Sequence, residues 1–223
     1  MDRLSAVMNK ARYHHGDLEA ALTEAARKLI ERDGRGQFSV AEACKLAGVS
    51  TAAPYRHFRD KQAILEAVAA HGFDALAERT IEARAEVQAR NGDYTEQIAV
   101  IGKAYVAYAK DNPEVFRLLF GSNPNVKDNP EVNIAGKRCF GVLIETVRQS
   151  LGGEASVEDV HRLAVPLWTF VHGAASLLID KDYHVAGSTI DVDAMVEAAA
   201  YALIKGGFDR IIASHDPKKA GTC

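Results

Sequence analysis

The spacing of apolar residues follows a helical period along almost the whole chain, and this pattern limits the possible fold more than any other. Near the N-terminus, apolar side chains recur at steps of three and four residues, which places them on one face of a helix. They are Leu18, Ala21, Leu22, Ala25, Ala26, Leu29 and Ile30. Val, Ile and Thr nowhere gather into an alternating run bounded by turn residues, so we expect no strand. The sequence therefore predicts an all-α fold.

Capping residues and helix breakers divide this pattern into about nine helices. We expect them at 18–33, 40–47, 51–58, 61–90, 95–112, 113–120, 130–151, 157–182 and 191–214. Asp17 and Ser50 are expected to cap the first and the third helix. The segments 121–129 and 183–190 are expected to be loops, because Asn, Pro and Gly or other turn residues interrupt the apolar period there.

The second and third predicted helices have the arrangement of a helix-turn-helix. Ser39 and Glu42 have the spacing of a capping box, in which each side chain bonds to the backbone N–H of the other. Gly48 supplies a turn residue that can take a positive φ. In this motif the first helix braces across the DNA backbone and the second enters the major groove by its N-terminal end. Helix 40–47 would be the brace and helix 51–58 the recognition helix.

The composition fits a soluble globular protein and excludes several other classes. The 223 residues are 48% hydrophobic and 26% charged, which is enough apolar material to bury a core. No run of about 18 uncharged apolar residues indicates a membrane span, and residues 1–10 lack the apolar core of a signal peptide. The cysteines Cys44, Cys139 and Cys223 form no CxxC pair, so neither a disulfide framework nor a zinc site is expected. We expect a cytoplasmic protein with no metal, cofactor or membrane partner.

The net charge of −3 divides unevenly along the chain. Residues 1–61 contain eleven Lys or Arg and eight Asp or Glu, a net charge of +3, and the remainder contains 16 and 22, a net charge of −6. A basic N-terminal part on an acidic body suits a protein that presents one end to a polyanion.

The residues around the predicted turn resemble the DNA-binding domain of the TetR family. The resemblance covers about residues 13–68 and rests on the run GVSTAAPYRHFRDK at 48–61, together with HGDL at 15–18. A second run, WTFVHG at 168–173, resembles the Trp-His-Gly signature of one subclass of TetR C-terminal domains. The first run is specific, because its combination of turn, aromatic and basic residues is hard to meet by accident.

The resemblance implies a transcriptional regulator with two functional parts. Residues 10–60 would form the helix-turn-helix DNA-binding domain and residues 61–214 an effector-binding and dimerisation domain, followed by a disordered tail at 215–223. Such a protein is expected to bind double-stranded operator DNA of palindromic sequence as a homodimer, most often as a repressor, and to release it when a small molecule binds. Two departures fall in the brace helix: Ala41 replaces a polar or basic residue, and Ala43 a bulky aliphatic one.

Nine residues are candidates for contact with DNA. Thr51 and Ala52 stand at the start of the recognition helix, where a hydroxyl can bond to a base edge and a methyl can touch thymine; small solvent-facing residues are the alternative. The resemblance assigns Tyr55 and His57 to the phosphate backbone, which Lys61 would also bind from the N-terminus of its helix. The full set is Ser39, Ser50, Thr51, Ala52, Pro54, Tyr55, His57, Lys61 and His15.

The last two long helices are each apolar on two stripes. The stripes are Val160, Leu163, Leu167, Val171, Ala174 and Leu178 beside Trp168, His172, Ala175 and Ile179, and then Val192, Val196, Ala199 and Leu203 beside Met195, Ala200 and Ile204. A helix that is apolar on two faces must bury both. One face of each helix would serve the core and the other a two-fold partner, in an intermolecular four-helix bundle. Burial of both faces within one subunit is the alternative.

Aromatic residues of the middle helices are candidates for the effector site, although most of them must belong to the core. The candidates are Tyr105, Tyr108, Phe116, Phe120, Phe140, Trp168 and His172. Such a lining suits an apolar or amphipathic molecule that takes one or two hydrogen bonds from Tyr105, Tyr108 or His172. An anionic ligand does not suit the acidic body unless an arginine is turned inward. A core histidine with a polar partner is the alternative for His172, and an inert buried thiol is the alternative to a sensor at Cys139.

Two other functions compete with this one. An enzyme is disfavoured because the chain has no Gly-rich phosphate loop after a strand, no HExxH pair and no GxSxG elbow. We therefore expect no catalytic and no metal-binding residues. An adaptor that keeps the fold but has lost DNA binding is disfavoured by Tyr55, His57 and Lys61, and is left open by Ala41.

Overall fold

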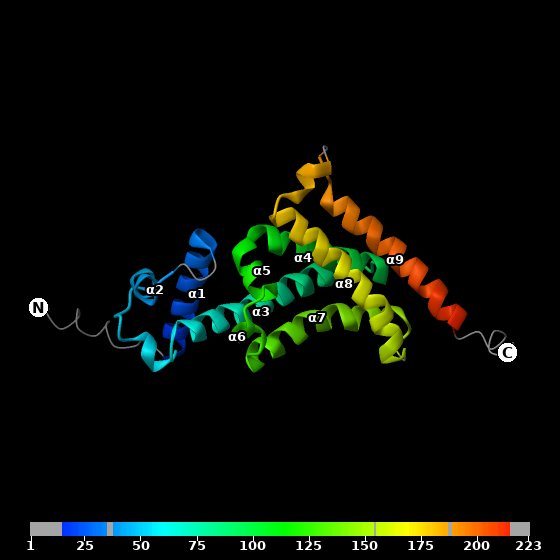
Figure 1. The fold of residues 1–223 in the computed structure, drawn as a ribbon. Helices are drawn as coiled ribbons and strands as arrows, with labels where there is room; N and C mark the ends of the chain where they lie inside the picture. Colours follow the sequence, from blue (N-terminus) through cyan, green and yellow to red (C-terminus); the bar gives the residue numbers. More distant parts are fainter. Residues whose placement is uncertain (1–14, 35–37, 154, 187–188, 215–223) are drawn as a thin grey trace, which may run out of the picture. The chain divides into compact units, whose positions relative to one another are not determined.

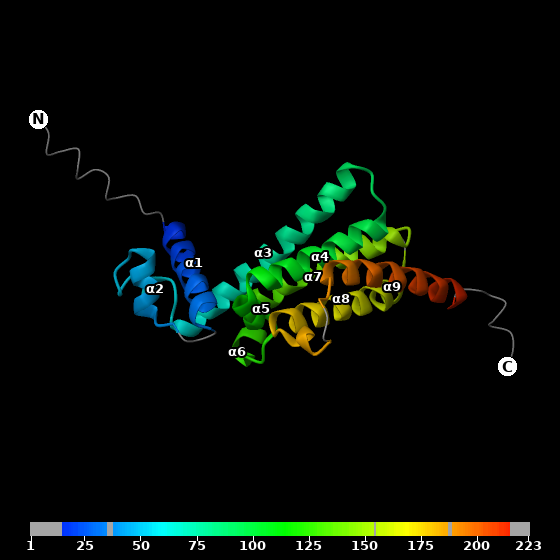
Figure 2. The same cartoon turned by 90° about the horizontal axis from the view of Figure 1, so that it is seen from above.

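The computed structural model describes residues 15–34, 38–153, 155–186 and 189–214, and every regular element within these ranges is helical. Figures 1 and 2 show long helices joined by short connections. The elements are α1 (His15–Asp33), α2 (Val40–Ala47), the 3-10 helix η1 (Pro54–Arg56), α3 (Lys61–Ala89), α4 (Tyr94–Asp111), α5 (Pro113–Phe120), α6 (Pro124–Lys127), α7 (Pro130–Ser150), α8 (Val157–Ile179), the 3-10 helix η2 (Asp182–Ala186) and α9 (Val192–Ser214). The all-α fold expected from the apolar period is confirmed.

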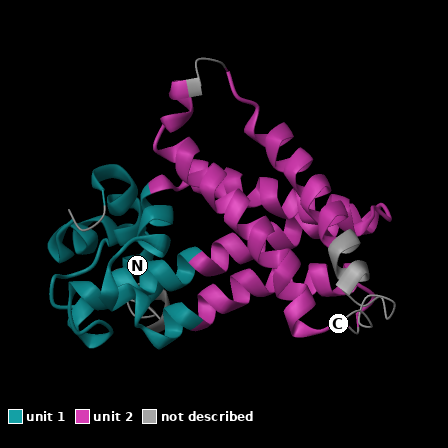
Figure 3. Cartoon of the chain, turned by 45° about the vertical axis from the view of Figure 1, so that its right-hand side comes forward, with its two compact units in different colours: residues 1–72, 114–133 teal, residues 73–113, 134–223 magenta. Residues whose placement is uncertain are grey.

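The chain divides into two compact units (Figure 3). Unit 1 comprises residues 1–72 and 114–133, and unit 2 comprises residues 73–113 and 134–223. Unit 1 is therefore discontinuous in sequence, because α5 and α6 fold with the N-terminal helices. The functional boundary expected at residue 60 concerns DNA binding and effector binding, and it stays a prediction. The tail expected at 215–223 lies outside the described residues.

Unit 1 is organised around the packing of α1 on α2. The apolar stripe of α1 faces inward, and the unit's buried side chains include Leu22, Ala26, Ile30, Phe38, Cys44, Phe58, Ile64 and Val68. Glu31 ties α5 to α1, since its carboxylate accepts the N–H groups of Glu114 at 3.2 Å and Val115 at 2.8 Å. These N–H groups lie in the first turn of α5 and have no partner within that helix.

In unit 2, α4, α8 and α9 pack against one another. Together with α7, these helices bury one hydrophobic cluster, which comprises Ile98, Ala99, Leu143, Val147, Val160, Leu163, Ala164, Leu167, Ala200 and Ile204. The second part of α3 runs along α7 in the same direction. Arg138 pairs with Asp74 at 2.6 Å, and ten residues further along α3 the guanidinium of Arg84 donates to the hydroxyl of Thr146 at 3.2 Å.

The third predicted helix, 51–58, is wrong in its form. Residues 51–53 form a turn, and only Pro54–Arg56 are helical, as the 3-10 helix η1. The N-cap of η1 is Ala53, which makes no side-chain capping bond, so Ser50 does not cap a helix as expected.

Pro54 explains this difference. It has no N–H to donate to the carbonyl of Ser50, so the bond that would open an α-helix at this point cannot form. Its own carbonyl accepts the N–H groups of both His57 at 2.9 Å and Phe58 at 2.8 Å. The segment therefore closes one helical turn, although it does not extend into a regular α-helix.

Three smaller expectations also differ from the structure. α1 begins at His15, so Asp17 lies inside the helix and not at its cap. The expected loop 121–129 contains the one-turn helix α6, which begins where the side chain of Asn123 accepts the N–H of Asn125 at 3.1 Å. The expected loop 183–190 overlaps η2.

Within the described ranges, α8 is the one helix long and apolar enough to cross a membrane by length and composition alone. Its most apolar window has a mean hydropathy of 1.3, and only 28% of that window is buried within the structure.

Candidate DNA-binding interface and effector site

The predicted capping box fixes the start of α2. Ser39 Oγ accepts the N–H of Glu42 at 3.2 Å, and the Glu42 carboxylate accepts the N–H of Ser39 at 2.8 Å. The Ser39 hydroxyl also donates to that carboxylate at 2.7 Å, and these bonds hold the pKa of Glu42 below its ordinary value. The capping box is confirmed, and the Ser39 side chain remains exposed at the end of the helix.

Gly48 ends α2 in a left-handed conformation, with φ 70° and ψ 28°. A residue with a Cβ atom adopts this conformation at a cost, which is why glycine suits the position. The N–H of Val49 then bonds to the carbonyl of Cys44 at 3.0 Å, so the chain turns sharply away from the helix. The turn of the predicted helix-turn-helix is therefore present in the structure.

The segment that follows the turn presents small side chains and one tyrosine to solvent. Ser50, Thr51 and Ala52 are exposed, and Tyr55 is 67% exposed, so packing does not account for the tyrosine. Pro54 is buried, and its predicted contact with DNA stays a prediction.

Lys61 is the first residue of α3, as expected. Asp60 caps the helix by accepting the N–H of Ala63 at 2.9 Å. The Lys61 ammonium lies 4.8 Å from the centre of the Phe38 ring, a cation–π contact that holds the charge at the helix N-terminus. The Lys61 ammonium therefore stands at the positive end of the α3 dipole, which is a favourable position for a phosphate.

The two histidines among the DNA candidates are placed differently. The side chain of His57 is only 13% exposed, and its Nδ1 lies 3.8 Å from a carboxylate oxygen of Glu19. A phosphate contact by His57 would require the ring to turn outward. The backbone of His15 opens α1, whereas its side chain lies outside the described residues.

Four of the predicted effector residues meet in unit 2: Tyr105 of α4, Phe140 of α7, and Trp168 and His172 of α8. Tyr105 Oη and His172 Nδ1 are 2.9 Å apart, and the Trp168 side chain also hydrogen-bonds to Tyr105. The ring centroid of Trp168 lies 5.7 Å from that of His172 and 5.6 Å from that of Phe140. We call these four residues the aromatic cluster. His172 thus has the polar partner that a histidine on an apolar stripe requires.

Burial keeps the polar groups of this region uncharged. It raises the pKa of Tyr105 far above its ordinary value and lowers the pKa of His172. It also raises the pKa of Cys139 to about 12, so this thiol is protonated at neutral pH and an inert thiol is better supported than a sensor. In the part of the chain that the structure describes, no group of three His, Cys, Asp or Glu residues could hold a metal ion.

The other three effector candidates lie on α4 and α5. Phe116 and Phe120 belong to α5 in unit 1, where their ring centroids are 4.9 Å apart. Phe116 is 2% exposed and Tyr108 of α4 is 5% exposed, as core residues are. The aromatic cluster is therefore the part of the predicted effector set that the structure brings together within one unit.

Two family models match this chain. Residues 22–68 match the model described as bacterial regulatory proteins, tetR family, and residues 98–203 match the model described as tetracyclin repressor-like, C-terminal domain. The chain belongs to the TetR family. The first match contains α2, the turn and the exposed segment, and the second contains the aromatic cluster. Members of this family are DNA-binding transcriptional regulators, so this TetR-family protein is a regulator and not an enzyme.

Three similar proteins share sequence or fold with most of this chain. A protein of unknown function from a Rhodococcus species has a solved structure that is 30% identical, with a TM-score of 0.72 over 88% of this chain and 98% of that one. A tetR-family transcriptional regulator from Streptomyces coelicolor is 16% identical and shares the fold, with a TM-score of 0.67 over 89% of each chain. The nucleoid occlusion factor SlmA of Vibrio cholerae is 25% identical over 172 residues, which are 74% of this chain and 85% of SlmA.

In this TetR-family regulator, the outward faces of α8 and α9 are surfaces that sequence reasoning missed. Much of both stripes on each helix is buried within the subunit; Val160, Leu167, Val196 and Ala200, for example, are all less than 5% exposed. The outward faces carry a further set of apolar or small residues: Val165, Thr169 and Leu177 on α8, and Ala194, Ala198, Tyr201 and Ala202 on α9. The alanines recur every four residues, and this spacing was the available signal.

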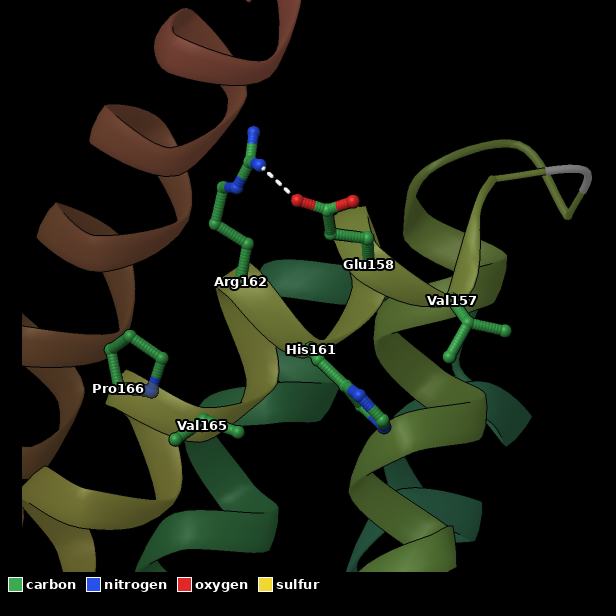
Figure 4. A pocket seen from close by; sticks show the side chains of 6 residues that line it. All are labelled: Val157, Glu158, His161, Arg162, Val165 and Pro166. Atoms are coloured by element: carbon green, nitrogen blue, oxygen red, sulfur yellow. Dashed lines mark hydrogen bonds and ion pairs between the residues drawn. The ribbon is translucent and has the colours of Figure 1, made fainter.

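A shallow groove of about 720 Å³ lies on the outward face of α8 (Figure 4). Its lining comprises Val157, Glu158, His161, Arg162, Val165 and Pro166. Arg162 and Glu158 form an ion pair at 2.7 Å along the groove, while Val157 and Val165 expose apolar carbon.

Proposed function

We propose that this TetR-family regulator is a cytoplasmic repressor that binds a palindromic operator as a homodimer and releases it when a small apolar or amphipathic molecule binds. The observation that carries the proposal is the exposed segment 50–52 with Tyr55, held by the capped helix α2 and followed by the cation of Lys61. On this proposal, side chains suited to base edges lie beside side chains suited to phosphates.

The exposed side chains divide into two kinds by chemistry. The Tyr55 hydroxyl and the Lys61 ammonium suit phosphate oxygens, which fix the position of a protein on DNA without reading its sequence. Thr51 and Ala52 can contact base edges or a thymine methyl, and they would supply the sequence preference. So short a recognition segment reads few base pairs, and a two-fold dimer that reads two half-sites overcomes this limit.

The outward faces of α8 and α9 support dimerisation through these helices. Only 28% of the apolar window of α8 is buried, and Val165 and Leu177 are 42% and 43% exposed. The alanines of α9 would allow a partner helix to approach closely. A second copy of the chain that packs its own α8 and α9 on these faces would form the four-helix bundle, in which the same patch serves both subunits.

The aromatic cluster supports an effector site in unit 2. Phe140 and Trp168 supply apolar surface, and the Tyr105–His172 pair can exchange its mutual hydrogen bond for one to a ligand. A ligand that binds more tightly to the arrangement of the dimer that does not fit DNA shifts the population toward it, and about 3 kcal/mol of preference gives more than a hundredfold.

Selection of random duplex DNA by the purified full-length protein tests the proposal directly. We expect enrichment of inverted half-sites whose centres lie about one helical turn or a multiple of it apart. The selected duplex, labelled and titrated with protein, then gives the stoichiometry of two chains per site. Selected sequences without inverted symmetry would contradict the dimeric mode, and the absence of any enrichment would favour the adaptor.

A further inference from the structure

Arg84 is an arginine of unit 2 that lacks an acidic partner. Its Nη1 donates to Thr146 Oγ1 at 3.2 Å, whereas its Nε is buried and has no hydrogen-bond partner. Arg79, on the same helix, pairs with Asp111 at 2.8 Å, but Arg84 forms no ion pair with any described residue. A guanidinium remains charged at all physiological pH values, and a buried N–H without an acceptor costs free energy. None of the described residues therefore provides an acceptor for the Nε–H group of Arg84.

The carboxylate of Glu145 interacts electrostatically with Arg84, but its oxygens already accept hydrogen bonds from other residues. Its carboxylate accepts hydrogen bonds from Arg148 and, at 2.7 Å, from Gln149. These two bonds are the main reason that the pKa of Glu145 lies below its ordinary value, while Arg84 contributes only through its distant charge. Glu145 therefore does not satisfy the Arg84 donors.

Thr146 fixes the orientation of the guanidinium. Its side chain is fully buried, and its hydroxyl donates to the carbonyl of Val142 at 2.8 Å while it accepts from Arg84 Nη1. One side of the guanidinium is thereby held. The other edge, formed by Nε and Nη2, presents two parallel N–H donors, and this geometry matches the two oxygens of a carboxylate.

Thr146, which holds the guanidinium, lies on the face of α7 that also carries Cys139, the neighbour in sequence of Phe140 in the aromatic cluster. Thr146 and Cys139 are seven residues apart, which is about two turns or about 10 Å along the helix and the same side of it. Cys139 lies near Tyr105, whose hydroxyl it influences. The buried residues Val142 and Leu143 occupy the stretch between. A cation therefore stands at one end of an apolar path and the aromatic cluster at the other.

We propose that the effector is an amphipathic carboxylate whose charged end binds the Nε–Nη2 edge of Arg84 and whose apolar part extends along α7 toward Tyr105 and Trp168. This inference rests on the proposed function and deepens it, since an inward-turned arginine is what an anionic effector requires. Because Nε is buried in the structure, the ligand must separate side chains between α3 and α7 in order to reach it. Binding is thus linked to a movement of α3, the helix that begins with Lys61.

Calorimetric titration of the full-length protein with sodium octanoate, 1-octanol and sodium acetate tests the charged contact. We expect octanoate to bind at least tenfold more tightly than 1-octanol, and acetate not to bind measurably. Arg84→Gln should weaken octanoate binding roughly 10- to 100-fold and leave 1-octanol unchanged, since hydrogen bonds to charged groups are worth that range of affinity. Arg79→Gln is the matched control, because Arg79 is paired with Asp111, and it should change neither.

Two further measurements separate binding from folding. Thr146→Val keeps the buried volume and removes the hydroxyl, so it should weaken octanoate binding only a few-fold. Arg84→Gln should leave the melting temperature of the ligand-free protein unchanged or raise it, because it removes a buried N–H that has no acceptor among the described residues. A fall of the melting temperature with unchanged octanoate affinity would show a purely structural arginine and overturn the proposal.

Equal affinities for octanoate and 1-octanol in the wild type would also overturn it, as would the absence of binding by any straight-chain acid from butanoate to dodecanoate. The titration contains no DNA, so either failure leaves operator binding untouched. Conversely, a protein that binds octanoate through Arg84 but enriches no duplex would refute the proposed function and leave the carboxylate site standing.

Discussion

At Lys61 one ammonium group lies over the Phe38 ring and also stands at the N-terminus of α3. Lys61→Ala should weaken binding to every duplex to a similar degree and reduce the slope of log affinity against log salt by about 1, since one phosphate contact is lost. Fluorescence anisotropy at several salt concentrations measures both quantities. Lys28→Ala is the control, because Lys28 is exposed on α1 beside Glu24. If Lys61→Ala left both the DNA affinity and its salt dependence unchanged, the start of α3 would lie away from the DNA phosphate backbone.

The contrasting residue is Thr51, which is exposed at the start of the recognition segment. If its hydroxyl reads a base edge, Thr51→Ala should alter the preference at one operator position by about 1–3 kcal/mol and leave the salt slope unchanged. A panel of duplexes with single substitutions in the selected operator measures this preference. A uniform loss across the panel would instead assign Thr51 to the phosphate backbone.

His172 makes the stability of unit 2 dependent on pH. Burial lowers its pKa from the ordinary 6.5, so the unfolded chain binds a proton more readily than the folded one. This contribution to stability is therefore complete above pH 6.5 and is lost as the pH falls from 6.5 through the lower folded pKa. His172→Asn, which keeps a hydrogen-bonding group near Tyr105 but does not titrate, should lose less stability between pH 7 and pH 5 in urea unfolding.

The control for this prediction is His71→Asn, which replaces an exposed histidine of α3. Its variant should keep the pH profile of the wild type. If His172→Asn followed the wild-type profile as well, other groups would account for the acid sensitivity.

At the scale of elements, Ser39 and Ser50, which lie on either side of α2, differ in whether they cap a helix. Ser39 makes the capping box, whereas η1 takes no side-chain cap from Ser50. Ser39→Ala should lower the free energy of unfolding by about 1 kcal/mol, and Ser50→Ala should change it by less than about 0.5 kcal/mol. Urea titration followed by circular dichroism gives both values. A larger loss for Ser50→Ala would show that the residue caps the recognition segment in solution.

The helices that were predicted correctly are those specified by local sequence. The apolar period of α1, the capping box of α2 and the breaks after α3 and α7 depend on residues within a few positions of each other, so the sequence alone contains the information. The recognition segment was not predicted correctly because one missing N–H, at Pro54, outweighed a helical pattern only eight residues long. So short a helix has little stability of its own.

What the sequence could not show depends on contacts between distant residues. The bond from Glu31 to the start of α5 joins residues 83 and 84 positions apart, and no local pattern announces it. Which stripe of α9 is buried within the subunit could not be predicted either, since the burial of Val196 follows from packing on α4 and α8 and not from its own helix. The partner of Arg84 on α7 is likewise 62 residues away.

At the scale of the whole molecule, dimerisation through the outward faces can be tested by single charges. Ala198→Glu should give folded monomers with little operator affinity, because an unpaired charge buried in an interface costs several kcal/mol. Sedimentation equilibrium reports the mass and circular dichroism the fold. Ala85→Glu, at an exposed position of α3, should remain dimeric. Val196→Glu should instead unfold the chain, since Val196 is 1% exposed within the subunit. Intact dimers in Ala198→Glu would refute the bundle.

The discontinuity of unit 1 has a consequence for recombination between related regulators. A single crossover after residue 72 would exchange α1, α2 and η1 but leave the recipient's α5 and α6 in place. Glu31 would then face the first turn of a foreign α5, and Glu66, which accepts a hydrogen bond from Asn129 at 2.8 Å, would face a foreign loop. Exchange of operator preference by gene shuffling therefore needs two segments to move together, 1–72 and 114–133, or a donor that already carries matching residues at both contacts.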